Sequence, residues 1–225
     1  GTDYVVIATG NPQIDGDVTI GAGSTLKISG TGTLTINPTK ILTIAGTADF
    51  GAKSVTLKSD VNGTAAIGQI TGTLSNASNV TVERYIPSGK RAFRLLSPAV
   101  TTTTFISGNW QGQTHITGGA SGGFDVTETN LPSMFTYNNI APSGTGWTAI
   151  ANTDATNLTA GVGYRVLIRG DRTPTNITAA SADAMNAAIT LSATGTLRTG
   201  EVALSSGTTP AINNTSNTTT AGYSL

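Results

Sequence analysis

His115 is the only histidine of the chain and the first candidate for catalysis. It lies in the polar, glycine-rich segment "GQTHITGG" (112–119). A hydrolytic triad needs a nucleophile, a histidine that takes its proton and an acid that orients the histidine. Serine and aspartate abound, but a single histidine in such a stretch is more typical of a loop, and a histidine-based metal site needs further ligands. The sequence therefore predicts no catalytic residue here.

Two carboxylates stand close together near the start of the chain. Asp15 and Asp17 are two residues apart in "IDGDVTI" (14–20), and with backbone carbonyls they could hold a calcium ion. The alternative is a turn in which each aspartate accepts hydrogen bonds from nearby amides. We expect the turn, so no cofactor is predicted, and calcium at these two residues is the alternative left open.

Two further aspartates lie in strings that resemble functional motifs. Asp171 belongs to "RGD" (169–171), and Asp154 lies in "ANTDATN" (151–157). A three-residue string occurs often by chance, so we infer neither an integrin site nor a metal site from them.

Basic residues form two groups along the sequence. Four of the 12 bases fall within residues 84–94, namely Arg84, Lys90, Arg91 and Arg94, and a second group is Arg165, Arg169 and Arg172. If the two segments are neighbouring strands, they form a basic stripe able to bind an acidic polysaccharide or another domain. The alternative is a solvated outer face. Trp110 and Trp147 could stack on sugar rings if exposed, although core packing is the expected role for most aromatic residues.

The first third of the chain offers little for polysaccharide cleavage. Enzymes built on a parallel β-helix need acids, or bases with acids, clustered on one face. The charged residues of segment 1–82 do not recur at a fixed interval; they are Asp3, Asp15, Asp17, Asp49, Asp60, Lys27, Lys40, Lys53 and Lys58. A solvated surface is the better interpretation, so we predict that the protein is not an enzyme.

Composition excludes several classes of function. Charged residues make up 11% of the 225 residues and the formal net charge is zero, which argues against binding to nucleic acid or to an anionic membrane. The sequence has no run of 18 apolar residues, so no membrane insertion is predicted. There is no cysteine, and threonine is the most frequent residue, ahead of 28 glycines. Threonine suits β-strands, and glycine and asparagine suit turns.

A repeat of two apolar residues dominates "VTIGAGSTLKISGTGTLTINPTKILTIAGTADFGA" (18–52). The pairs recur every eight residues, at Val18/Ile20, Leu26/Ile28, Leu34/Ile36, Leu42/Ile44 and Phe50/Ala52. Residues two apart point to one face of a strand, and the segments between the pairs are rich in turn residues. An antiparallel meander and a solenoid of three strands per coil both fit. We favour the solenoid, with Val18/Ile20 beneath Leu42/Ile44, because stacked coils give four-residue strands partners above and below.

Composition changes near residue 85. Of the 12 aromatic residues only Tyr4 and Phe50 come earlier, and aromatic side chains indicate a broader core, as between two sheets. We therefore predict an all-β protein with a short parallel β-solenoid (β-helix) at 1–84 and an antiparallel β-sandwich at 85–225. The strands expected in the second part are 92–96, 133–137, 147–151, 163–169, 188–193 and 201–204, the last two as a hairpin within 189–204. Residues 205–222 read as a polar low-complexity loop.

Several segments after residue 78 resemble a bacterial family. "NVTVERYIPSGKRAFRLLSPAVT" (79–101), "PSMFTYNN" (132–139) and "GYRVLIRGDR" (163–172) are similar to segments of large secreted surface proteins of Bacteroidota. The resemblance covers about residues 79–225. It implies a β-solenoid before this region, export by the type 9 secretion system and a C-terminal sorting domain further along. The chain starts "GTDYVV" and ends "AGYSL", and we interpret it as a fragment of such a protein.

The resemblance implies an extracellular location at the outer surface of the cell. Some members of the family are adhesins of gliding bacteria, so we expect a non-enzymatic structural and adhesive segment, with roles in cell adhesion or gliding motility. Secretion translocon or anchoring proteins, and extracellular glycans, are the expected partners. The alternatives are a carbohydrate-binding module and a fragment of a polysaccharide-degrading β-helix enzyme.

Overall fold

The computed structural model describes residues 5–8, 10–138, 145–174, 177 and 185–200. Regular structure in this part is almost entirely β-strand, with two short 3-10 helices, η1 (Ile106–Gly108) and η2 (Trp110–Gly112). The all-β class predicted from the sequence is confirmed. The predicted strand 201–204 and the predicted polar loop 205–222 lie outside the described residues.

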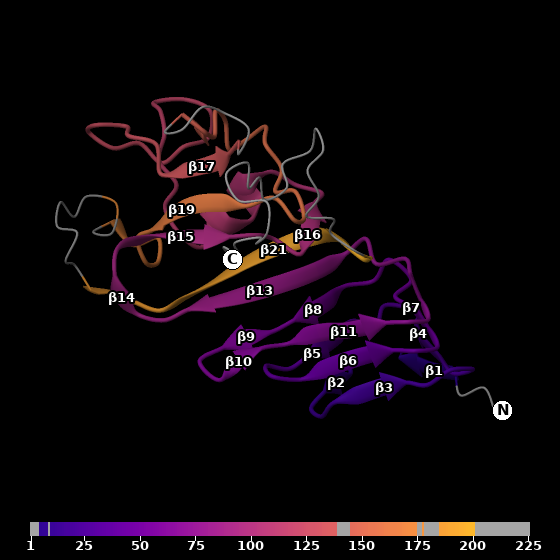
Figure 1. Cartoon of the computed structure of the whole chain (residues 1–225). Helices are drawn as coiled ribbons and strands as arrows, with labels where there is room; N and C mark the ends of the chain where they lie inside the picture. The colour runs from indigo at the N-terminus through magenta and orange to yellow at the C-terminus, as the bar shows by residue number, and fades with distance from the viewer. Residues whose placement is uncertain (1–4, 9, 139–144, 175–176, 178–184, 201–225) are drawn as a thin grey trace, which may run out of the picture.

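From β1 to β12 the described residues pass repeatedly through three sheets, in which the strands of this part run parallel (Figure 1). The first sheet contains β1 (Val5–Ala8), β4 (Thr25–Ile28), β7 (Thr47–Asp49) and β12 (Thr73–Ser75). The second begins with β2 (Gln13–Ile14), β5 (Leu34–Ile36) and β8 (Val55–Leu57). The third contains β3 (Val18–Ile20), β6 (Ile41–Ile44) and β11 (Ala66–Ile70). We call one passage through the three sheets a winding.

The register stacks apolar pairs of successive windings. Val18 lies opposite Leu42 and Ile20 opposite Ile44, which confirms the predicted stacking. The side chains of Leu42 and Ile44 are fully buried, whereas the alternating threonines of these strands are at least partly exposed. Burial of such a side chain stabilises the fold by about 1.5–3 kcal/mol. The alternation of the sequence therefore separates the inner from the outer face of each winding.

The predicted pair Phe50/Ala52 is wrong. The strand at this position is β7, and its inward residue is Ala48, which lies opposite Leu26. Phe50 is buried but follows the strand, and Ala52 lies in a turn with a φ of 55°. The physical reason is the corner between β6 and β7, which has only two residues, 45 and 46, so the next strand begins early.

Glycines occupy equivalent corners in successive windings. Gly46 and Ala45 both donate to the carbonyl of Ile20, at 2.9 and 2.8 Å, and one winding later Gly72 donates to that of Ile44 at 3.1 Å. A Cβ on Gly46 would lie 2.2 Å from the carbonyl oxygen of Gly21, so no larger residue fits. The close approach of two backbones explains why this corner carries glycine.

A short hairpin interrupts the windings between β8 and β11. It consists of β9 (Ser59–Asp60) and β10 (Gly63–Thr64), which pair antiparallel. Glu83 holds the hairpin against the next strand, since its carboxylate accepts hydrogen bonds from Lys58 Nζ at 2.9 Å and from the Ser59 amide at 3.1 Å.

Strand β13 (Val80–Ile86) connects the windings to the rest of the molecule. Its first three residues pair in parallel with β8, and all seven pair antiparallel with β21 (Ile189–Leu197). Strand β21 also pairs with β16 (Val100–Thr102). The predicted boundary between residues 84 and 85 thus falls inside β13, and the division into two domains stays a prediction. The predicted strand 188–193 is confirmed, but it continues to Leu197.

A separate antiparallel sheet lies beyond β21 (Figure 1). Its order is β15–β19–β17–β18, and we call it the outer sheet; its strands are β15 (Ala92–Leu96), β19 (Tyr164–Ile168), β17 (Met134–Tyr137) and β18 (Trp147–Ala149). All four coincide with strands expected from the sequence to within two residues. The short strands β14 (Gly89–Lys90) and β20 (Met185–Asn186) pair with each other.

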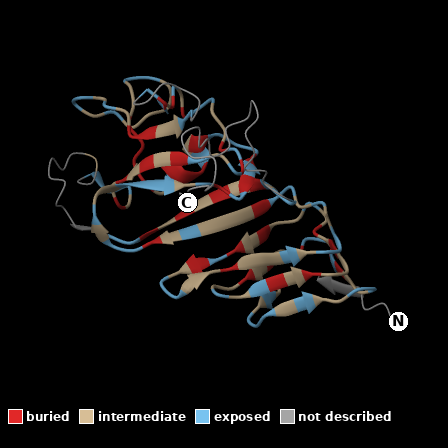
Figure 2. Ribbon diagram, viewed as in Figure 1, coloured by how far each residue is buried: buried red, intermediate tan, exposed pale blue. Residues whose placement is uncertain are grey.

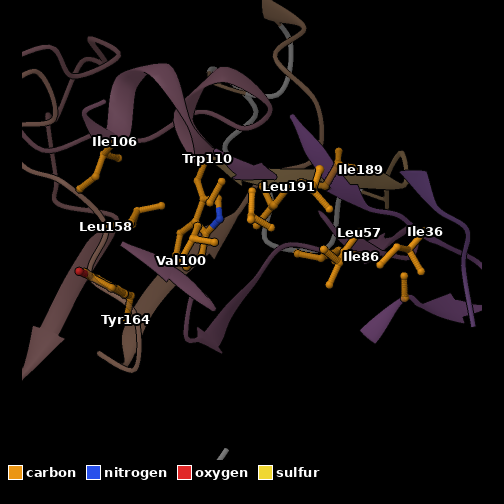
Figure 3. Packing of buried hydrophobic residues seen from close by; sticks show 14 of the residues in the cluster. Ile36, Leu57, Ile86, Val100, Ile106, Trp110, Leu158, Tyr164, Ile189 and Leu191 are labelled. Carbon is orange, nitrogen blue, oxygen red and sulfur yellow. The ribbon is translucent and has the colours of Figure 1, made fainter. Parts of the chain in front are cut away.

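Buried apolar residues form one cluster that runs from the windings to the outer sheet (Figure 3). Ile36 and Leu57 belong to the windings, Ile86 to β13, and Val166 and Tyr164 to the outer sheet. Figure 2 shows the corresponding buried segments on facing strands. The outer sheet therefore packs one face against the core, and several side chains of its other face are exposed to solvent.

Candidate functional site

The outer face of the outer sheet gathers aromatic side chains around one arginine. Phe135 and Leu95 lie opposite Arg165 on the two neighbouring strands, and Trp147 lies opposite Tyr137. Residues opposite each other on paired strands share a face, and residues two apart on a strand do so as well. We call this surface the aromatic face; it consists of Phe93, Leu95, Phe135, Tyr137, Trp147, Ala149, Arg165 and Leu167.

Alternation along the strands explains why these side chains point outward. The residues between them, such as Met134, Tyr164 and Val166, are at most 3% exposed and pack into the core. Successive side chains of a strand point to opposite faces, so a sheet that packs one set into the core directs the other set away from it. On most antiparallel sheets the exposed set is polar, so an exposed apolar set is unusual.

Arg165 lies over three of the rings. Its guanidinium carbon is 4.4 Å from the ring centre of Phe93, 4.5 Å from that of Phe135 and 4.6 Å from that of Trp147. A cation–π contact contributes about 0.5–1 kcal/mol at an exposed site and more when desolvated. The rings also contact one another, with Tyr137 and Trp147 at 4.8 Å and Phe93 and Phe135 at 6.0 Å between centroids. The arginine is therefore held in one position by its neighbours.

Much of the aromatic face is open to solvent. Leu95 is 52% exposed, Tyr137 49%, Phe93 44% and Trp147 38%. A single exposed apolar residue needs no explanation, but a contiguous exposed patch marks an interaction site on most soluble proteins. Within the described residues Arg165 has no ion-pair partner. The face thus combines exposed apolar area with one uncompensated positive charge.

Of the two tryptophans considered from the sequence as ligand-binding residues, only one lies on the aromatic face. Trp147 belongs to the aromatic face, as its proposed role in ligand binding requires. Trp110 does not, and its assignment to a ligand surface is wrong. Its side chain is 5% exposed and packs edge-on against Tyr164, with 5.8 Å between ring centroids, because η2 turns it into the core.

The two basic groups meet at Arg91 and Arg169, where the charge of Arg91 lowers the pKa of Arg169, but Arg94 and Arg165 do not continue this contact on one face of the sheet. Strands β15 and β19 are neighbours, but Arg94 lies opposite Val166 whereas Arg165 lies opposite Leu95, so the two arginines occupy opposite faces of the sheet. Arg84 is exposed on β13 and Lys90 is exposed on β14, outside the outer sheet. Burial lowers the pKa of Arg91 from its ordinary value. A partner-binding role for Arg84, Lys90, Arg91 and Arg94 stays a prediction.

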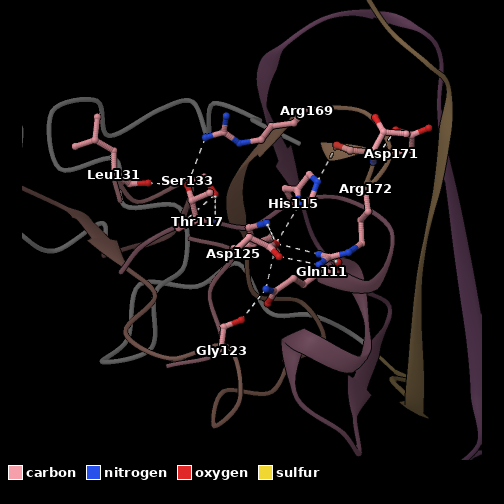
Figure 4. Close-up of polar contacts among 12 residues, drawn as sticks. Gln111, His115, Thr117, Gly123, Asp125, Leu131, Ser133, Arg169, Asp171 and Arg172 are labelled. Atoms are coloured by element: carbon pink, nitrogen blue, oxygen red, sulfur yellow. Dashed lines mark hydrogen bonds and ion pairs between the residues drawn. The ribbon is translucent and has the colours of Figure 1, made fainter. Parts of the chain in front are cut away.

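A second polar cluster centres on Asp125, which the sequence did not single out (Figure 4). Arg172 donates to both carboxylate oxygens, Nη2 to Oδ1 at 2.7 Å and Nη1 to Oδ2 at 2.9 Å, and the amide of Ile116 donates to Oδ2 at 3.0 Å. Burial alone would raise the pKa of Asp125, but these hydrogen bonds, with the charges of Arg172 and His115, outweigh it and hold the pKa below its ordinary value.

His115 is a member of this cluster and is not an exposed loop residue. It is 6% exposed, its Nδ1 lies 3.4 Å from Asp125 Oδ2, and its Nε2 donates to the carbonyl of Thr173 at 3.2 Å. Together with Arg172, it ties loop 111–125 to the segment after β19.

Burial also lowers the pKa of Arg169, which lies close to this cluster. Burial and the positive charge of Arg91 lower the pKa of Arg169, and Asp125 partly opposes the effect. Arg169 Nη2 donates to Thr117 Oγ1 at 3.4 Å, and Thr117 Oγ1 donates to the Leu131 carbonyl at 2.7 Å. These two hydrogen bonds therefore extend the polar cluster from Asp125 to Thr117 and Leu131.

Residues 119–123, "GASGG", have the G-x-S-x-G spacing of a nucleophile elbow, with Ser121 at its centre. That motif works on a sharp turn between a strand and a helix. Here Ser121 is exposed in a loop of bends with neither element beside it. Ser133, the serine nearest to Thr117, is buried, and its Oγ accepts a hydrogen bond from the Thr117 amide at 2.8 Å.

Asp15 and Asp17 make hydrogen bonds between windings. Asn37 Nδ2 donates to Asp15, and the amide of Ile41 donates to Asp17 Oδ1 at 3.0 Å. The described part of the chain contains no group of three or more His, Cys, Asp or Glu side chains arranged to hold a metal ion. Asp171 caps a local turn, since its Oδ1 accepts a hydrogen bond from the Thr173 amide at 3.2 Å. At Asp154 the capping side chain is that of Asn152, whose Oδ1 accepts from the Asp154 amide at 2.7 Å.

Comparison of the chain with family models, with curated proteins and with solved structures finds no match. In the part that the structure describes, no helix has the length and apolar character needed to cross a membrane. The functional proposal therefore rests on the geometry of the aromatic face.

Proposed function

We propose that this chain is a non-enzymatic structural and adhesive segment of a large exported bacterial surface protein. The observation that carries the proposal is the aromatic face, an exposed apolar patch around Arg165 on a sheet whose opposite face is packed into the core. A binding surface on a rigid sheet needs little ordering when it meets a partner, which favours affinity. Export by the type 9 secretion system and a location at the cell surface are the part of the proposal supported by the sequence resemblance.

The windings support the structural half of the proposal. Each winding bonds to the next through backbone hydrogen bonds, such as those from Thr47 to Ser24 at 2.9 Å and from Thr73 to Gly46 at 2.8 Å. Side chains add further bonds at the corners, for example from Asn76 Nδ2 to Asp49 Oδ1 at 2.8 Å. A body held together along its whole length by such bonds resists extension, as an adhesive stalk requires.

A carbohydrate-binding module is the second candidate. The adjacent rings of Tyr137 and Trp147 favour it, because both are well exposed and aromatic rings stack on the apolar faces of sugars. In this reading the same face binds glycan and the chain again performs no chemistry.

The proposal is tested with beads that carry the purified chain. Their retention under flow is measured on glass coated with acidic glycans, neutral glycans or proteins, and a panel of polysaccharides is assayed for depolymerisation. We expect retention on at least one coating, reduced about tenfold by the double substitution Phe93→Ser/Trp147→Ser and unchanged by Lys27→Gln, whose side chain is exposed on β4 of the windings. Retention on sugars alone would favour the carbohydrate-binding module. Cleavage of any polymer, or retention that the double substitution leaves intact, would overturn the proposal.

A further inference from the structure

We infer that the aromatic face docks a second, different protein, through a surface that places an Asp or Glu carboxylate on Arg165 between apolar side chains. This inference rests on the binding role proposed for that face. It names the class of partner and the atoms that recognise it.

The composition of the face matches the core of a protein–protein interface. Such cores are enriched in Tyr, Trp, Phe and Arg and poor in Lys, Glu, Asp and Ser. The aromatic face contains all four enriched types, and its remaining members are Leu95, Leu167 and Ala149. Leu95 is its most exposed member at 52%. Aliphatic side chains bury well against another protein but offer no flat surface to a sugar ring.

The position of Arg165 also argues for a protein. Its guanidinium covers the faces of Phe93, Phe135 and Trp147 at 4.4–4.6 Å, and these are the faces on which a sugar would stack. A glycan would have to displace the arginine from three favourable contacts. No described residue accepts a hydrogen bond from Arg165, and its Nε is buried without a partner, so the guanidinium still has N–H groups to offer to a carboxylate while its ring contacts stay in place.

The charge of Arg165 identifies the recognised group. No described Asp or Glu forms an ion pair with it. A guanidinium presents parallel N–H donors that match a carboxylate, and stacking between the rings fixes their direction before the partner arrives. The apolar surroundings would strengthen that pair once water is excluded. The complementary group is therefore a carboxylate.

The same charge excludes a second copy of this chain. Two copies joined face to face about a two-fold axis would bring like surfaces together. Each aromatic face supplies one arginine and no carboxylate, so the two positive charges would meet unpaired in an apolar interface, at a high energetic cost. The partner must bring the negative charge.

The probe is a library of random dodecapeptides displayed on phage, selected against the immobilised full chain. Selected peptides are then synthesised, and their affinities are measured by fluorescence anisotropy for the wild type and four variants. Arg165→Gln removes the charge, Arg165→Lys keeps it without the planar fork, and Trp147→Ala removes a ring. Arg94→Gln is the matched control, because Arg94 is exposed on the opposite face of the same sheet. Far-UV circular dichroism and the midpoint of thermal unfolding verify that each variant folds.

We expect selected peptides to contain Asp or Glu beside Leu, Phe or Trp. Their affinity should fall about tenfold or more in Arg165→Gln and Trp147→Ala, partly recover in Arg165→Lys and stay unchanged in Arg94→Gln. Replacing the peptide carboxylate by an amide should cause a similar loss for the wild type and little further loss for Arg165→Gln.

Four results would overturn the inference: no enriched peptide, peptides without acids, equal losses in Arg165→Gln and Arg94→Gln, or self-association of the chain through this face. Alginate and dextran are measured alongside the peptides. Binding of alginate or dextran that depends on Arg165 or Trp147, without peptide binding, would also overturn the docking inference while leaving the adhesive role intact. Polymer cleavage would remove the adhesive role even if acidic peptides bind, so the two proposals fail separately.

Discussion

The glycine corners of the windings allow a sharp test of how closely the windings stack. A Cβ placed on Gly46 would lie 2.2 Å from the carbonyl oxygen of Gly21 and 2.4 Å from that of Ser24. Both contacts are with backbone, which cannot move aside as a flexible side chain can. Gly21 occupies the same corner one winding earlier, and a Cβ there meets nothing within 4 Å. Gly46→Ala and Gly21→Ala are therefore the same substitution in the same corner, with and without a clash.

The size of the effect follows from the contacts that must lengthen. To admit the methyl group, the two windings have to separate by roughly 1 Å at this corner, where strands lie about 4.8 Å apart. The hydrogen bonds from Ala45 and Gly46 to Ile20 and from Thr47 to Ser24 then stretch beyond their present 2.8–2.9 Å. Loss of one or two such bonds costs about 1 kcal/mol each, and overpacking adds about 1–3 kcal/mol. We expect Gly46→Ala to lower the free energy of unfolding by about 2–4 kcal/mol.

The control should behave differently. Gly21→Ala is free of the clash and reduces the freedom of the unfolded chain, so we expect a change within about 1 kcal/mol of the wild type. Urea unfolding followed by far-UV circular dichroism measures both variants, and an unchanged dependence on urea confirms that the comparison is valid. If Gly46→Ala were as stable as Gly21→Ala to within about 0.5 kcal/mol, the close stacking of the corners would be refuted.

Three further predictions concern stability. Leu42→Ala should lower the free energy of unfolding by about 2–5 kcal/mol, because it leaves a cavity between windings, whereas Thr43→Ala on the outer side should change it by less than about 1 kcal/mol; urea unfolding tests both. Gly195→Ala, whose Cβ would lie 2.0 Å from the Thr101 carbonyl oxygen, should lower the midpoint of thermal unfolding, and an unchanged midpoint would contradict the tight pairing of β21 with β16. The pKa of Asp125 is lowered below its ordinary value of 3.8 in the folded state, so its contribution to stability is full above that value and is lost as the pH falls through the folded pKa. The difference in unfolding free energy between the wild type and Asp125→Asn should therefore be constant near neutral pH and shrink below about pH 4, and a difference that does not change with pH would show that the charge is unimportant.

The windings could be predicted from the sequence because their pattern is local and repeats. Apolar residues two apart, separated by turn residues, determine which side chains point inward, and the pairing of Ile20 with Ile44 follows from the eight-residue spacing once three strands are taken to form one winding. The pattern failed at Phe50, where a two-residue corner shifts the strand. Whether a corner closes in two residues or four depends on backbone contacts with the winding below, which a single segment does not reveal.

The aromatic face could be predicted only in part. Its strands were expected from their composition, but the order β15–β19–β17–β18 joins segments far apart in the chain, and the sequence carries no local sign of that order. Because the sequence does not reveal this arrangement, it could not show that Trp110 is buried and Trp147 exposed, although the two side chains are chemically identical. The sequence alone does not point to Asp125, because its ion pair is with Arg172, which lies 47 residues later.

The stacking of the windings has a consequence for how the length of this molecule can change. Strands β3 and β6, β4 and β7, and β5 and β8 pair without a register shift, whereas the register shifts between β6 and β11. Removing or duplicating a winding in the regular part would therefore leave both neighbours with a matching surface. Such a change would move β13 and the outer sheet by about 4.8 Å per winding along the stack without altering any residue of either. The length of the windings could thus change by whole units while every residue of the aromatic face stays the same.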